Sequence, residues 1–276
     1  MKLSVPLCFW PINTRIPGKF LILVPLLLSL TYSNLLCQEG GSKIKSNILS
    51  FSPGSNQIKE NILIPKVHRG SLIRISYRYE NESRNYNEFS FNFGYSKVKT
   101  RLETEKLTQN EQLSFSYSWG KSLIIQEKVK YYLGLNAGYD WSLMEYVVWD
   151  ESRGYWGTSL TAGPYNRVAV KLNNKCSWIS SFHFNLLGIL SRPEDVRIYA
   201  QEEWTLTNIM KITNNDFSLG IMNNILICNF KSEYRIPFKG DNFLSVYGSL
   251  FYETISKSEG QPLQILQITA GMGVGF

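Results

Sequence analysis

Residues 263–276, LQILQITAGMGVGF, decide the fold class because they alternate with a strict two-residue period up to the last residue. One face carries large and apolar side chains: Leu266, Ile268, Ala270, Met272, Val274 and Phe276. The other face carries small and polar residues: Gln267, Thr269, Gly271, Gly273 and Gly275. Successive side chains of a β-strand point to opposite faces. The segment therefore predicts a strand with lipid on its apolar side and a polar barrel interior behind it.

The same segment resembles the closing strand of bacterial outer-membrane β-barrel proteins, which ends on a C-terminal aromatic residue. In that class the barrel-assembly machinery reads this strand, so the resemblance implies that Phe276, Val274 and Met272 form the assembly signal. It also implies a location in the outer membrane of a Gram-negative bacterium, among membrane lipid and lipopolysaccharide. The resemblance is to the general class and reaches no specific family.

The start of the chain predicts export. Residues 20–30, FLILVPLLLSL, form an apolar run preceded by Arg15 and Lys19. A membrane-spanning helix needs about 20 apolar residues, so this shorter run fits the core of a signal peptide. We expect a signal peptide over residues 1–37, with cleavage near residue 34 or 38. Lipidation of Cys37 is an alternative, although the residue before it, Leu36, is not the small residue of lipoprotein signals.

Composition argues against other classes. The mean hydropathy is −0.16, as expected where alternate strand residues are polar. Without the three basic residues of the leader, 26 basic residues face 22 acidic ones, a surplus of about four that is too small and too scattered for a nucleic-acid surface. With two histidines and no clustered cysteines, we expect neither a metal site nor another cofactor. Cys176 and Cys228 lie on predicted strands that are not neighbours, so we expect free thiols.

The mature chain reads as an all-β protein, a transmembrane antiparallel up-and-down barrel of about twelve strands. Residues 38–57 are polar and predict a flexible periplasmic lead-in, and residues 58–276 predict the barrel. The candidate strands are 57–65, 71–80, 87–98, 110–119, 129–148, 155–170, 176–188, 202–213, 216–222, 225–236, 243–256 and 263–276. The first strand and the pair around Asn223 are the weakest, which leaves ten strands as the alternative.

Turn residues predict which connections lie at each end of the barrel. An even strand number leaves both termini in the periplasm. Residues 173–175, 213–215 and 239–241 then become short periplasmic turns, because Asn, Gly and Asp favour tight turns. Residues 99–109, 149–154, 189–201 and 257–262 become outer loops.

The distribution of side chains separates two all-β alternatives. A soluble periplasmic β-protein would bury its aromatic face and expose many lysines and glutamates. Here aromatic residues such as Phe89, Phe91 and Phe93 alternate with Ser90 and Asn92. Small polar residues suit the wet interior of a membrane barrel better than a solvent-exposed sheet face, so we favour the membrane barrel.

Function must come from the interior and the loops, because a fold alone does not specify it. The predicted strand faces turn charged and polar side chains of both signs inward: Arg74, Arg78, Asp140, His183, Asn185, Lys211, Asn229, Lys231, Glu233, Arg235 and Glu253. These side chains could fill the lumen with ion pairs, or they could line a polar path for small solutes. We therefore expect a structural, assembly or passive small-solute role, with the protein partner left open.

An enzyme is the alternative. Ser181, His183 and Asn185 share one strand face, which resembles the Ser and His pairs of outer-membrane phospholipases and lipid A deacylases. The phospholipase pattern has a Ser two residues after its His within a glycine-bounded segment, whereas this chain has Asn185 there. Those enzymes also hold their catalytic groups toward lipid, but the strand parity turns His183 inward. A hydrogen-bonded lumen histidine is the simpler interpretation, and we expect no catalytic site.

Overall fold

The computed structural model describes residues 44–60, 66–99, 108–146, 153–172, 176–192, 210–211, 213–215, 217–257 and 262–276. The predicted signal peptide, residues 1–37, lies outside this part of the chain and stays a prediction. The described part contains no helix long and apolar enough to cross a membrane.

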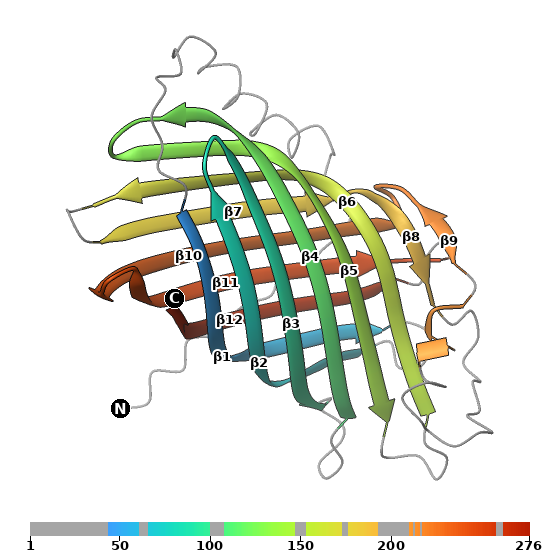
Figure 1. The fold of residues 1–276 in the computed structure, drawn as a ribbon. Coiled ribbons are helices and arrows are strands. Elements are labelled where there is room, and N and C mark those ends of the chain that lie inside the picture. Colours follow the sequence, from blue (N-terminus) through green and yellow to red (C-terminus); the bar gives the residue numbers. More distant parts are fainter. Residues whose placement is uncertain are drawn as a thin grey trace, which may run out of the picture. The chain divides into compact units, whose positions relative to one another are not determined.

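The described residues form twelve strands (Figure 1). The strands are β1 (Ile44–Glu60), β2 (Lys66–Glu82), β3 (Asn85–Lys99), β4 (Thr108–Ile125), β5 (Val129–Tyr146), β6 (Arg153–Lys171), β7 (Ser177–Asn185), β8 (Leu187–Ser191), β9 (Ser218–Gly220), β10 (Ile225–Lys239), β11 (Asn242–Ile255) and β12 (Leu263–Gly275). All pairings are antiparallel, and β1 to β7 with β10 to β12 close a ring of ten strands. The predicted all-β, up-and-down barrel is confirmed, with ten strands in the ring and two outside it.

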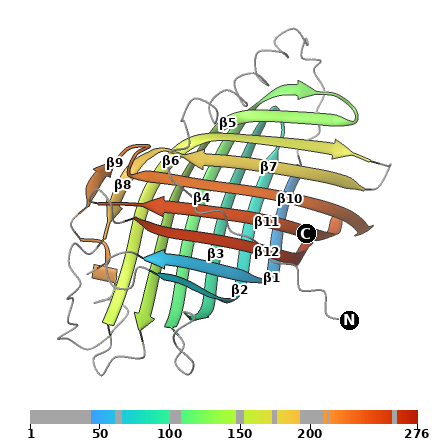
Figure 2. The same ribbon diagram turned by 180° about the vertical axis from the view of Figure 1, so that it is seen from behind.

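The closing strand lies where the sequence predicts it. β12 pairs with β11 on one side and with β1 on the other, which seals the barrel, as the view from behind shows (Figure 2). Asn47 and Phe276 exchange both backbone hydrogen bonds, so the pairing reaches the last residue. Ile268 and Met272 are 53% and 63% exposed on the outer face, whereas Gln267 is 1% exposed inside. The two-residue alternation thus sets which side chains face each side of the wall.

The strands β8 and β9 lie outside the ring because the chain between β7 and β10 is longer than the wall requires there. β6 pairs with β7 and then with β8, so β7 and β8 follow one line along β6. β10 pairs with β7 up to Asn185, and β9 pairs with β8 from Gly188 onward. The extra residues between β9 and β10 fold into a turn in which the Asn224 N–H donates to the Ile221 carbonyl. The predicted strand 176–188 is therefore split at Leu186.

The sequence places the first strand too late. The prediction put it at 57–65 after a flexible lead-in over 38–57, but β1 runs over Ile44–Glu60. Its polar composition suggested a flexible segment, yet Ser46, Ser50, Ser52 and Asn56 are buried inside the barrel. Small polar residues on alternate positions are what an inner barrel wall requires.

The predicted strand 202–213 is wrong where the structure describes it. Met210 and Lys211 are helical, and Thr213 has helical geometry as well. Lys211, expected to point inward from a strand, therefore lies on no strand. The remainder, residues 202–209, lies outside the described residues.

The two ends of the ring differ in the length of their connections. The short-turn end carries the start of β1, the end of β12 and the connections 83–84, 126–128, 172–176 and 240–241. The long-loop end carries the connections 61–65, 100–107, 147–152, 192–217 and 256–262. The predicted turn 239–241 belongs to the short-turn end, and Gly240 there has a φ of 58°, a left-handed value that favours glycine, whereas the predicted turn 173–175 lies outside the described residues. The predicted turn 213–215 instead belongs to the long-loop end, because only ten strands form the ring.

The strands β7 and β10, which carry or adjoin Cys228 and Cys176, are neighbours, contrary to the prediction. The two thiols are nevertheless free. Cys228 is paired with Phe184, eight residues along β7 from Cys176, so the two sulfur atoms lie at different levels of the wall.

Gly134 marks a close approach of two strands and generates a test. A Cβ atom at Gly134 of β5 would lie 1.9 Å from the Trp119 carbonyl oxygen of β4, whereas one at Gly138 would have its nearest neighbours 3.6 Å away. Gly134→Ala should destabilise the barrel by about 1–3 kcal/mol, because backbone must move. Gly138→Ala, on the same face of the same strand, is the matched control and should be neutral or stabilising. The temperature at which the compact gel band disappears measures both, and equal midpoints would contradict this close approach.

Candidate functional site

The barrel interior is the candidate site, and it has three levels along the strands. The charged layer lies near the short-turn end and consists of Arg78, Glu80, Glu82, Lys130, Arg167, Lys231, Glu233 and Arg235. The central chamber follows it. The apolar cluster lies toward the long-loop end and consists of Ile58, Met144, Tyr155, Leu190, Ile225, Ile227, Ile255, Leu263 and Ile265.

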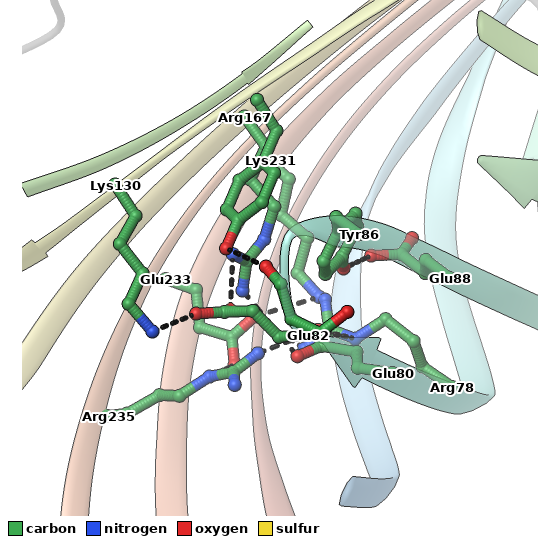
Figure 3. Close-up of polar contacts among 12 residues, drawn as sticks. Arg78, Glu80, Glu82, Tyr86, Glu88, Lys130, Arg167, Lys231, Glu233 and Arg235 are labelled. Atoms are coloured by element: carbon green, nitrogen blue, oxygen red, sulfur yellow. Dashed lines mark hydrogen bonds and ion pairs between the residues drawn. The ribbon is translucent and has the colours of Figure 1, made fainter. Parts of the chain in front are cut away.

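The charged layer joins opposite sides of the ring through ion pairs (Figure 3). Glu233 of β10 lies in ion pairs with Arg78 of β2, with Lys231 at 3.3 Å and with Arg235 at 2.7 Å. Glu80 of β2 lies 2.7 Å from Arg235 and 3.6 Å from Arg167 of β6. The alternation places these side chains inward, and ring closure brings residues from distant strands together.

The second carboxylate of β2 extends the layer to β5 and β6. Glu82 accepts hydrogen bonds from Lys130 at 2.7 Å and from Arg167 at 2.8 Å. Arg167 is 1% exposed, so its charge depends on these partners rather than on water. The layer thus contains two buried carboxylates, Glu80 and Glu233, that each contact three cations.

Aromatic rings support the surplus of cations in the charged layer. The guanidinium of Arg167 lies 4.2 Å from the centre of the Tyr86 ring, and the Lys231 ammonium lies 4.4 Å from that of Tyr247. The rings of Tyr86, Tyr132 and Tyr165 pack against one another next to the Arg167 guanidinium. A ring face attracts a cation through its quadrupole, so these contacts offset part of the missing negative charge.

The central chamber is polar and adjoins the charged layer. It offers about 120 Å³ to the centres of water molecules, which is room for roughly ten waters. Its wall is rich in short hydroxyl and amide side chains, including Ser90, Asn92, Ser116, Asn136 and Ser249. Some of them pair across neighbouring strands, as Ser90 does with Ser116 at 2.7 Å. Such a wall can hydrogen-bond water or a small polar molecule.

Side chains also close the long-loop end. The apolar cluster draws on β1, β5, β6, β8, β10, β11 and β12. Ile58, Leu190 and Ile225 are completely buried there. The Nε of Arg192 donates a hydrogen bond of 2.8 Å to the hydroxyl of Tyr155 at this level. The polar chamber therefore lies between a charged and an apolar barrier.

The predicted lumen residues other than Lys211 lie inside the barrel. Arg74, Arg78, Asp140, His183, Lys231 and Glu253 line the central chamber, together with Asn185 and Asn229. Glu233 and Arg235 belong to the charged layer. Met272, Val274 and Phe276, the predicted assembly signal, are exposed on the outside.

Sequence reasoning missed four members of the charged layer: Glu80, Glu82, Lys130 and Arg167. Glu80, Glu82 and Lys130 lie on the same strand faces as the predicted inward residues Arg78 and Asp140, whereas no residue of β6, the strand of Arg167, was predicted to point inward. Extending the two-residue step from Arg78 would have found Glu80 and Glu82. The pairing of these residues across the lumen carries no signal of its own in the sequence.

The residues Ser181, His183 and Asn185 do not form a hydrolytic triad. All three line the central chamber rather than the lipid-facing wall. The Nδ2 of Asn185 donates to Asn136 at 3.0 Å and to Thr161 at 2.9 Å, and its Oδ1 has no hydrogen-bond partner. Asn185 therefore does not orient the imidazole of His183, as the third member of a triad must.

Within the described residues no group of three or more His, Cys, Asp or Glu side chains could hold a metal ion.

The fold and interior define the class as a closed antiparallel barrel with an apolar exterior and a charged, polar interior. No protein family and no curated protein matches the sequence. The similar solved structures are bacterial outer-membrane β-barrel proteins. The outer-membrane protease OmpT from Escherichia coli shares 8% identity over 88% of this chain and 99% of that chain, with a TM-score of 0.49. The translocator domain of the autotransporter NalP from Neisseria meningitidis shares 8% identity over 94% and 97%, with a TM-score of 0.42. The fold assignment itself rests on the strand pairings.

The charged layer generates a stability test. Glu233→Gln should destabilise the barrel by about 3–5 kcal/mol, because it leaves Arg78, Lys231 and Arg235 without their shared carboxylate. Urea unfolding of the purified protein in detergent micelles measures the free energy. Glu111→Gln, the same chemical change at a residue of β4 outside the charged layer, is the control and should change little. Similar unfolding curves for both variants would mean that the ion pairs contribute no net stability.

Proposed function

We propose that the chain is an outer-membrane β-barrel protein with a structural role, whose interior is closed to passive diffusion by its own side chains. The proposal includes export through the signal peptide over residues 1–37. It also includes recognition of the closing strand, with Met272, Val274 and Phe276, by the barrel-assembly machinery. Membrane lipid and lipopolysaccharide then surround the barrel.

The observation that carries the membrane location is a ring of exposed apolar side chains around the whole wall. Every strand of the ring contributes at least one: Leu49 and Phe51, Ile73 and Ile75, Phe89 and Phe93, Phe115 and Tyr117, Leu135, Leu160, Trp178, Phe230 and Ile236, Val246 and Leu250, and Ile268 and Met272. A monomeric soluble protein rarely exposes so continuous an apolar surface, since contact with water is unfavourable. Lipid removes that cost, so the outer face supports a transmembrane barrel.

The closed interior supports a structural role over an open pore. The charged layer joins β2, β5, β6 and β10, and the apolar cluster fills the opposite end of the chamber. Passage of a hydrated ion through the barrel would require buried ion pairs to separate. Separating such pairs costs several kcal/mol, which makes spontaneous passage slow.

Membrane residence is tested first by fractionation and heat-modifiability. The protein should be found in the outer-membrane fraction and should migrate faster on a gel when it is not boiled, because a closed barrel stays compact in detergent. A protein recovered from the periplasm without a band shift would support the soluble alternative and would overturn the proposal.

Ile75→Arg distinguishes lipid from water outside the wall. Ile75 is 51% exposed and is paired with Phe51 on one side and Phe93 on the other. In a membrane the substitution should destabilise the barrel by up to about 2–4 kcal/mol and reduce the yield of the compact form. Ile75→Leu is the control. If the outer face contacts water, the arginine variant should fold as well as the wild type.

Conductance tests the closed interior. Purified wild-type barrel reconstituted in planar bilayers should give no steady current in salt solution, because the charged layer and the apolar cluster lie in series. A reference porin in the same bilayers controls for insertion. Stable, long-lived current steps from the wild-type protein would show an open path and would replace the structural role with solute passage.

A further inference from the structure

The central chamber holds charged side chains of both signs that lie outside the ion pairs of the charged layer. The five cations of the charged layer each lie in an ion pair with a carboxylate. Arg74, Asp140 and Glu253 line the chamber, and none of them is part of an ion pair within the described residues. This contrast within one interior distinguishes the chamber from the layer beneath it.

Arg74 is held in place with donors to spare. Its guanidinium donates to the amide oxygen of Gln267, whose Nε2 in turn donates to Gln112. A guanidinium carries five N–H donors in a planar fork that matches a carboxylate. The anchored Arg74 therefore presents unused N–H donors and a positive charge to the chamber.

Asp140 and Glu253 come together on the same side of the wall. Asp140 of β5 is the register partner of Ser159 of β6, and the hydroxyl of Ser159 lies 3.5 Å from the Oε1 of Glu253. Asn185 lines the chamber nearby, and its buried Oδ1 has no partner. A Cβ atom built on Gly138 would lie 3.6 Å from both the Asn185 Nδ2 and the Asp140 Oδ2, so these two side chains border one space.

We propose that the central chamber binds a small zwitterion, a molecule with one carboxylate and one primary ammonium group, of the size of a small amino acid. Arg74 binds the carboxylate. Asp140 and Glu253 bind the ammonium group, and Asn185 offers a third acceptor to its three N–H donors. The hydroxyl and amide wall accommodates the polar remainder. This assignment goes beyond the structural role, because it concerns the interior whether or not the barrel conducts.

The physical reason is charge complementarity in a confined space. An unpaired charge inside a protein is unfavourable because it loses the solvation that bulk water provides. Water in the chamber supplies part of that solvation, whereas a zwitterion places a carboxylate beside Arg74 and an ammonium group beside Asp140 and Glu253 at the same time. A simple anion can bind Arg74 but is repelled by Asp140 and Glu253. A simple cation can bind Asp140 and Glu253 but is repelled by Arg74.

Access to the chamber from the short-turn end passes the charged layer and the tyrosines packed against it. A second cavity at that end is lined by Glu80, Glu82, Lys130 and Arg235. Arg78 and Lys231 line the central chamber on the other side of the same layer. Only side chains separate the two spaces within the described residues, so a small solute needs side-chain rearrangement and no opening of the wall.

Isothermal titration calorimetry on the folded full-length protein in detergent micelles tests the assignment. Glycine and alanine are the zwitterionic probes, acetate and methylammonium are the single-charge probes, and glycerol is the neutral probe. We expect a zwitterion to bind at least tenfold more tightly than either single-charge probe. Equal weak responses to all probes, or no response to any, would mean that the chamber holds water only and would overturn the proposal.

Variants assign the two ends of the ligand. Arg74→Gln should weaken zwitterion binding at least tenfold, and so should Asp140→Asn combined with Glu253→Gln. Gly138→Leu keeps all three charges but grows into the chamber, so it should also abolish binding. Lys121→Gln, at an exposed residue of β4, should bind like the wild type. The unboiled gel band confirms that each variant is folded.

Unchanged binding in Arg74→Gln or in Gly138→Leu would place the ligand outside the chamber and would overturn the proposal. These measurements need only the folded barrel in micelles. Fractionation tests the membrane location, and conductance tests the closed lumen. The proposed function and the proposed zwitterion site can therefore be contradicted independently.

Discussion

Closure of the hydrogen-bonded ring between β1 and β12 is the constraint on which the rest of the structure depends. An antiparallel sheet with open edges leaves backbone N–H and C=O groups unpaired, and lipid offers them no partners. The pairing of β1 with β12 up to Asn47 and Phe276 removes both edges. Once the ring is closed, the exposed apolar side chains of all ten strands share one outer surface, and the inward side chains share one interior.

The interior follows from the size of that ring. A barrel of intermediate strand number encloses more space than a filled eight-stranded barrel but less than an open porin. Here side chains fill the space at two levels. Ion pairs and tyrosines fill it near the short turns, and mainly branched aliphatic side chains fill it near the long connections. Between them remains the polar chamber, where Arg74, Asp140 and Glu253 are part of no ion pair with another described residue.

The strand pattern could be predicted where both faces of a strand have distinct compositions. The alternation in 263–276 gave the correct faces for β12, and the runs around Phe91 and Phe115 did the same for β3 and β4. Prediction from alternation failed where the amino-acid composition of a strand resembled that of a loop. Residues 44–57 are rich in Ser and Asn, yet they form most of β1, and Asn56 finds its partners Ser96 and Asn110 only inside the closed barrel.

The sequence by itself determined the fold class and the inward direction of Arg74, Arg78, Asp140 and Glu253, because strand alternation is a local property of two-residue period. The tertiary structure decided the ten-stranded ring, the exit of β8 and β9, and the choice of which charges pair. Glu80 meets Arg235 across 155 residues of chain only because closure and strand register set their neighbours. The distance between two such residues depends on every strand between them, and no local pattern contains it.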